Sequence, residues 1–113
     1  LVNADMVGHT GKRRAIIKSL EEVDKALEKI ILASQKNNYA AFIFADHGNA
    51  EDHTIKWRTS HTTNPVHFIL VSDNENLKKL TLKKGRSLCD IAPTVLKIMG
   101  IKQPKEMNGK SLI

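Results

Sequence analysis

The sequence predicts an α/β protein in which helices cover a small β-sheet. Apolar residues recur every three or four positions over residues 12–36, which is the period of an amphipathic helix. Two apolar runs of strand length follow, over residues 39–45 and 66–71, and a second helical segment comes after them. The order helix, strand, loop, strand, helix is typical of α/β layer folds.

Each element is justified by its own residues. Residues 1–10 contain glycine and polar side chains and are expected to form a loop. The helix over residues 12–36 is expected to end at Asn37-Asn38, because asparagine tolerates the left-handed conformation that often ends helices. On its charged face, Glu21 precedes Lys25 by four positions, the favourable order for a helical ion pair.

The two strands and the segment between them come next. The run 39–45 is apolar without alternation, which favours a strand covered on both faces, as in a parallel sheet. Residues 46–65 have no periodicity and form a long loop, and loops of this length are usually functional. The second strand, 66–71, is followed by a polar turn at 72–76.

The last elements are a helix and an irregular tail. The helix is expected to begin at Ser87 or Asp90 and to reach Met99, with Pro93 in its first turn and Gly100 as its stop. Residues 101–113 are expected to pack without regular structure.

Length and composition exclude several classes of protein. A chain of 113 residues forms one domain or a piece of one, and 41% hydrophobic residues argue against wholesale disorder. Its longest apolar run, residues 39–45, is too short to cross a bilayer, and no secretory pattern opens the sequence. The single cysteine, Cys89, excludes a disulfide framework and a cysteine-rich zinc module. We therefore expect a cytoplasmic protein without a membrane partner.

The net charge of +6 suggests a polyanionic partner, either nucleic acid or a small phosphorylated substrate. Aromatic residues make up only 4% of the chain and fall in the strand-like runs, so a platform for stacking bases is lacking. A solvated lysine-rich surface is the favoured explanation of the charge. A small basic nucleic-acid-binding module remains as a remote alternative, and we expect no nucleic-acid partner.

Residues that can bind metal ions fall in three short segments at element boundaries. These candidate ligands are Asp5, His9, Asp46, His47 and His61. Asp46 and His47 follow a strand directly, where ligands of α/β sheets collect, and Gly48 lets the chain turn so that both side chains can face one ion. Oxygen and imidazole ligands without thiolate suit Mn, Zn, Fe or Co. The competing explanation for any one segment is a capping aspartate and a surface histidine.

Five motifs in this order resemble the C-terminal part of cofactor-independent (2,3-bisphosphoglycerate-independent) phosphoglycerate mutase. The motifs are NADMVGHTG at 3–11, ADHGNAE at 45–51, HTTNPV at 61–66, SLCDIAPT at 87–94 and MNGKSLI at 107–113. The resemblance covers essentially the whole chain. It implies a partial alkaline-phosphatase-like layered sheet with helices, in which residues 1–113 are a C-terminal fragment of the metal-binding phosphatase domain.

The resemblance also implies a reaction and a ligand set. The family interconverts 3-phosphoglycerate and 2-phosphoglycerate through a phosphoserine intermediate at a two-manganese site, as an isomerase of glycolysis and gluconeogenesis that needs no 2,3-bisphosphoglycerate. Asp5, His9 and His61 match the ligands of one manganese, and Asp46 and His47 match ligands of the other. The nucleophilic serine and the substrate-binding domain match nothing in these residues, so the isolated chain is expected to be inactive.

Two further expectations accompany this interpretation. Another metalloenzyme of the alkaline phosphatase superfamily, such as a phosphatase, phosphopentomutase or sulfatase, shares the Asp-His ligand pattern and stays an alternative. A sheet that lacks its other strands has unpaired edges, so the chain is expected to self-associate through an exposed edge.

Overall fold

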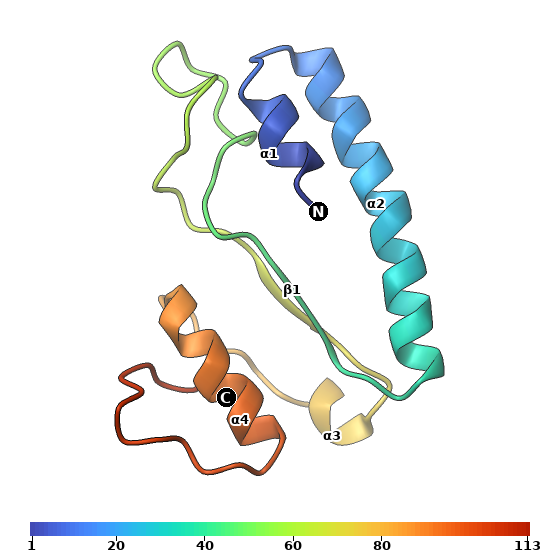
Figure 1. The fold of residues 1–113 in the computed structure, drawn as a ribbon, viewed down its shortest axis with the longest axis vertical. Coiled ribbons are helices and arrows are strands. Elements are labelled where there is room, and N and C mark those ends of the chain that lie inside the picture. The colour runs from blue at the N-terminus through green and yellow to red at the C-terminus, as the bar shows by residue number, and fades with distance from the viewer. The chain divides into compact units, whose positions relative to one another are not determined.

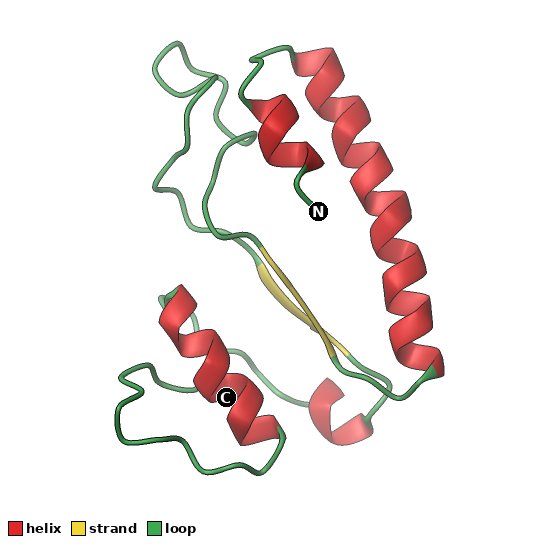
Figure 2. Ribbon diagram, viewed as in Figure 1, coloured by secondary structure: helices red, strands yellow, loops and turns green.

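The computed structural model describes residues 1–113 and divides them into two compact units, Leu1–Glu75 and Asn76–Ile113. The first unit holds two helices and a pair of strands, and the second holds most of a one-turn helix, a 3-10 turn, a longer helix and the C-terminal tail (Figures 1 and 2). None of the helices combines the length and apolar character that a membrane span requires.

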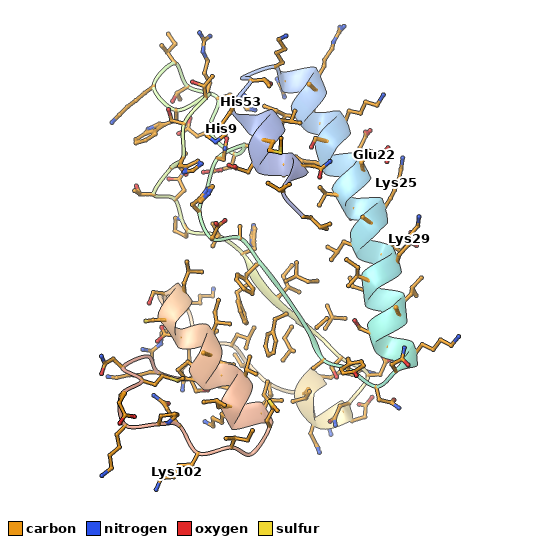
Figure 3. All side chains as sticks on the ribbon, in the orientation of Figure 1. His9, Glu22, Lys25, Lys29, His53 and Lys102 are labelled. Atoms are coloured by element: carbon orange, nitrogen blue, oxygen red, sulfur yellow. The ribbon has the colours of Figure 1, made fainter.

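The long helix α2 (Arg13–Lys36) confirms the helical period of the sequence. Its buried positions, Ile16 and Ser19, are three residues apart and therefore lie on one face. The helix ends where the sequence predicts, because Asn38 adopts φ = +58° and the Asn37 side chain donates to the carbonyl of Ala33 at 2.8 Å. The prediction of an ion pair between Glu21 and Lys25 is wrong. Lys25 instead pairs with Glu22 at 2.8 Å, three positions earlier in the sequence. Both residues point away from the strands (Figure 3).

The prediction of a loop over residues 1–10 is also wrong. Residues Asn3–Gly8 form a short helix, α1, which packs beside α2 (Figure 1). No side chain caps the N-terminus of α1, so local capping does not explain why this helix forms. Asp5 in its first turn complements the helix dipole, and contact with α2 adds to the stability of α1.

The sheet has two strands, β1 (Ala41–Phe44) and β2 (Phe68–Val71), which pair antiparallel with Ala41 opposite Val71. The sequence therefore places both strands correctly, but the expectation of a parallel sheet is wrong for this pair. Phe44 is 47% exposed and Ile69 48% exposed, whereas the other residues of the two strands are half-buried. The loop between the strands contains no helix or strand and brings its two ends back together (Figure 2).

The second unit is built on α4 (Ile91–Ile98), which follows a 3-10 turn at Leu88–Asp90. Ser87 and Asp90 form a reciprocal capping box at its start, and Gly100 (φ = +68°) follows its end, as the sequence predicts. A single helical turn, α3 (Glu75–Lys78), replaces part of the expected polar turn at 72–76. The tail is irregular, as expected, and its Leu112 is 5% exposed.

Candidate metal centre

The first unit brings Asp5, His9 and His61 together. Asp5 lies in α1 and His9 follows its last residue, so four-residue spacing places both side chains on one helix face. His61 comes from the far end of the long loop, shortly before β2. One ligand atom from each residue lies within 4.8 Å of the others. The segment that contains Asp5 and His9 and the segment that contains His61 therefore contribute to one cluster.

The spacing within this cluster suits one metal ion. The Nε2 atoms of His9 and His61 lie 3.0 Å apart, and they lie 3.3 Å and 3.2 Å from Asp5 Oδ1. Ligands about 2.0–2.2 Å from a tetrahedral ion are about 3.3–3.6 Å from one another. The three donor atoms therefore stand nearly at the separations that a shared ion requires, and two imidazoles with one carboxylate suit a borderline divalent metal.

The backbone fixes which imidazole nitrogen faces the cluster. His9 Nδ1 lies 2.9 Å from the carbonyl oxygen of Thr59, and His47 Nδ1 lies 3.2 Å from that of Gly48. A carbonyl can only accept, so each Nδ1 donates a proton to the backbone and each ring turns its Nε2 toward Asp5. An Nε2 that faces a carboxylate oxygen is matched to it by a proton or by a metal cation between the two atoms. The geometry therefore fits a bound cation, and it is the arrangement that outer hydrogen bonds give to metal-binding histidines.

Asp46 and His47 stand beside this cluster. His47 Nε2 lies 3.6 Å from Asp46 Oδ1 and 4.0 Å from Asp5 Oδ1. The His47 ring also stacks on His61, with ring centres 3.6 Å apart and planes 21° from parallel. The Asp46 side chain is 79% exposed. The structure thus brings His47 to the edge of the cluster and leaves Asp46 on its outer side, whereas His53 and His67 are not among the residues that converge on Asp5.

Asn49 is a residue of this site that sequence reasoning did not single out. Asn49 is buried, with 7% of the residue exposed, and its side chain donates to Asp5 Oδ1 at 2.7 Å. This bond, more than the charges of the neighbouring histidines, holds the pKa of Asp5 below its ordinary value. Gly8 makes room for Asn49, since a Cβ on Gly8 would lie 2.5 Å from Asn49 Oδ1. The signal in the sequence was the motif itself, where an amide follows Asp46-His47-Gly48.

Glu51 is the second residue of this site that sequence reasoning did not single out. Its carboxylate accepts the backbone N–H of Asn49 at 2.6 Å, the Asn64 side chain at 3.0 Å and the hydroxyl of Thr62. Partial burial raises the pKa of Glu51, but hydrogen bonds from Thr62, Asn64 and the backbone of Glu51 and Asn49 together outweigh it, so the net pKa is lowered. Glu51 therefore connects the beginning and the end of the long loop.

Gly48 has a different role from the one expected. Its φ is not positive, so no turn at this residue needs glycine. It forms an isolated antiparallel bridge with Thr62, in which the Thr62 N–H donates to the Gly48 carbonyl at 2.8 Å. A Cβ on Gly48 would lie 2.2 Å from Thr62 Oγ1 and 2.3 Å from Glu51 Oε1. Glycine is therefore needed for close approach of the two ends of the loop.

A family model, described as the metalloenzyme superfamily, matches residues 1–103. This chain belongs to the metalloenzyme superfamily. Among its curated relatives, the 2,3-bisphosphoglycerate-independent phosphoglycerate mutase of Ehrlichia canis is 49% identical over 115 residues, and that of Gracilaria tenuistipitata is 46% identical over 114 residues. Each alignment covers 98% of this chain and 22% of the relative, so the chain spans about a fifth of the length of these mutases.

Within the superfamily, one solved structure extends the likeness to three dimensions. A crystal structure of Leishmania mexicana phosphoglycerate mutase, determined at low cobalt concentration, is 28% identical and superposes with a TM-score of 0.74. The match covers 98% of this chain and 23% of that one. The predicted fold class, a partial alkaline-phosphatase-like α/β layer, is confirmed, and so is the resemblance to cofactor-independent phosphoglycerate mutases.

Proposed function

We propose that residues 1–113 are the C-terminal metal-binding segment of a phosphoglycerate mutase that interconverts 3-phosphoglycerate and 2-phosphoglycerate without 2,3-bisphosphoglycerate. The observation that carries the proposal is the convergence of Asp5, His9 and His61, with ligand atoms 3.0–3.3 Å apart, in a chain nearly half identical to such mutases. The phosphoglycerate is the substrate of the whole enzyme, which acts in the cytoplasm as part of glycolysis and gluconeogenesis.

In this proposal Asp5, His9 and His61 hold one divalent ion, and Asp46 and His47 contribute to a second. Manganese is the proposed metal, with zinc, cobalt or iron(II) as possible replacements on the chemistry of the ligands. A divalent ion held by these residues would supply charge neutralisation for the transferring phosphoryl group and would favour ionisation of the serine that the resemblance makes the nucleophile.

Other residues of this chain orient the metal ligands and set the charge of the site. Thr59 holds the Nδ1 proton of His9 and so directs its Nε2 inward, and Gly48 does the same for His47. Asn49 keeps Asp5 ionised by donating to its carboxylate. Asp5 therefore supplies a negative charge beside imidazole nitrogens, a combination that attracts divalent cations.

The isolated chain is proposed to be inactive, because the resemblance places the nucleophilic serine and the substrate-binding domain outside these residues. Its strands also leave apolar positions uncovered, Phe44 at 47% and Ile69 at 48% exposed. We propose that the isolated chain self-associates through this two-stranded sheet, because each strand has an unpaired edge.

The test uses the full-length protein that contains this chain. The protein is stripped of metal with a chelator, Mn²⁺ is added back, and conversion of 3-phosphoglycerate is followed by a coupled enolase assay. The expected result is activity that depends on the metal and not on 2,3-bisphosphoglycerate, is lost in His61→Ala and is retained in His53→Ala. Full activity of His61→Ala, or turnover by the purified 113-residue chain, would contradict the proposal.

A further inference from the structure

We propose that Glu51 is a positioning residue that joins the two ends of the long loop and thereby sets the rings of His47 and His61 for metal binding. The inference rests on the proposed function, and it assigns a role to a side chain that is not one of the ligands. It is carried by the contacts of the Glu51 carboxylate with residues on both sides of the loop.

The first step is the position of the donors. Asn49 lies two residues after His47, and its N–H donates to Glu51 Oε2 at 2.6 Å. Thr62 directly follows His61, and its hydroxyl donates to Glu51 Oε1, which Asn64 also reaches at 3.0 Å. One carboxylate thus holds the backbone N–H two residues after His47 and the side chain of the residue after His61.

The second step is the backbone that these bonds reinforce. Gly48 and Thr62 form the bridge between the two ends, and Thr62 is 6% exposed. A single bridge is a weak connection between two segments 14 positions apart, since a two-stranded pairing is marginal even when longer. Hydrogen bonds to a charged acceptor are about twice as strong as neutral ones. Glu51 therefore supplies most of the polar connection across this bridge.

The third step is the chemistry of the acceptor. All three partners of Glu51 donate, and an ionised carboxylate only accepts, so the match is complete. A glutamine would place its NH₂ group against either the Asn49 N–H or the Thr62 hydroxyl. The site therefore selects glutamate rather than its neutral isostere.

The last step connects Glu51 to the cluster. The His47 and His61 rings stack with centres 3.6 Å apart, and the bridge that Glu51 supports lies directly beside both residues in sequence. Asn49 links Glu51 to the cluster, because its backbone N–H donates to Glu51 and its side-chain amide donates to Asp5. Loss of Glu51 is thus expected to loosen His47, His61 and the Asn49–Asp5 bond together.

The experiment compares Glu51→Ala and Glu51→Gln with Asp52→Ala in the full-length protein. Asp52 is the adjacent carboxylate, and its bond is a local one to the Thr54 N–H at 2.9 Å. Mn²⁺ affinity is measured from the electron paramagnetic resonance signal of free Mn²⁺, and the Co²⁺-loaded protein is examined by visible absorption. We expect Glu51→Ala to lower Mn²⁺ affinity about 10–100-fold, as outer partners of metal ligands do, and to alter the Co²⁺ bands. Asp52→Ala is expected to change neither.

A second measurement works without metal. Hydrogen–deuterium exchange of the metal-free protein is expected to accelerate at the Asn49 and Thr62 amides in Glu51→Ala, with exchange in α2 unchanged. Thr62→Val is expected to weaken Mn²⁺ binding, and Thr62→Ser, which keeps the hydroxyl, is expected to restore it. If Glu51→Ala fails to fold, the comparison of Thr62→Val with Thr62→Ser tests the Glu51–Thr62 bond instead.

The two hypotheses fail in different ways. If the wild-type protein binds no Mn²⁺ or Co²⁺, the proposed function is wrong, while the exchange data still decide whether Glu51 holds the loop. If the wild-type protein binds metal and Glu51→Ala or Thr62→Val leaves affinity, the Co²⁺ spectrum and amide exchange unchanged, the role of Glu51 is wrong and the metal site stands.

Discussion

The Nε2 atoms of His9 and His61 lie 3.0 Å apart, although 52 positions separate the two residues in the sequence. Asp5 Oδ1 lies 3.3 Å and 3.2 Å from these nitrogens, so the pair shares one carboxylate. Two imidazole nitrogens and a carboxylate oxygen at this spacing can share one metal cation. The metal proposal depends on this arrangement.

The first prediction concerns the ligands themselves. His9→Ala and His61→Ala each remove one of three converging donors, so Mn²⁺ affinity should fall by more than the about 10–100-fold typical of outer partners. Titration calorimetry of the full-length protein measures the loss. His53→Ala is the matched control, because His53 lies in the same long loop and outside the cluster. Equal affinity of the three variants would exclude a site at His9 and His61.

The second prediction concerns the buried hydroxyl of Thr94. It donates to the Asp90 carbonyl at 2.6 Å and accepts the Leu112 N–H at 2.9 Å, and Thr94 is 0% exposed. Thr94→Val leaves the Leu112 N–H without a partner, which should lower the free energy of unfolding by about 1–3 kcal/mol. Thr94→Ser keeps both bonds and should lower the free energy of unfolding by less. Chemical denaturation of the chain provides the comparison, and a valine variant as stable as the serine variant would refute the assignment.

The third prediction concerns Gly109. A Cβ at this position would lie 2.0 Å from the backbone oxygen of Cys89, which cannot rotate away. Gly109→Ala should therefore destabilise the chain by about 1–3 kcal/mol or more, through overpacking. Gly85 has φ = +67° and open space around it, so Gly85→Ala should cost only about 1 kcal/mol of backbone strain. Thermal melts monitored by circular dichroism should rank the two variants in this order.

The fourth prediction concerns acid. The backbone N–H groups of Lys110 and Ser87, at 2.7 Å and 3.0 Å, hold the pKa of Asp90 below its ordinary value of 3.8. Because the folded pKa is the lower one, this stabilisation is complete above the ordinary value and is lost as the pH falls through the folded pKa. Asp90→Asn should therefore lower the melting temperature at neutral pH, and the difference from wild type should shrink below about pH 4. A difference that stays constant with pH would show that the charge of Asp90 contributes nothing.

Much of the fold follows from local patterns in the sequence. The period of α2, its stop at Asn38 and the boundaries of α4 depend on nearest neighbours and caps, which the sequence displays directly. The short helix α1 was missed because its stabilisation comes from contact with α2, which no local pattern reports. The direction of pairing between β1 and β2 was missed because continuous apolar runs indicate burial but not strand direction.

The candidate site divides in a similar way. Asp5, His9, Asp46, His47 and His61 could be chosen because ligand chemistry is a property of residue type and because their motifs resemble a known family. Asn49 and Glu51 act through hydrogen bonds to residues up to 44 positions away, and such partners become visible only when the loop ends meet. Polar residues that orient a site are therefore harder to infer than the residues that form it.

Anomalous diffraction from crystals of the full-length protein grown with Mn²⁺ tests the metal site most directly. We predict an anomalous peak within bonding distance of Asp5 Oδ1, His9 Nε2 and His61 Nε2. The peak should vanish in His61→Ala and persist in His53→Ala. A peak elsewhere, or none at saturating Mn²⁺ with these three side chains in place, would exclude the proposed metal site.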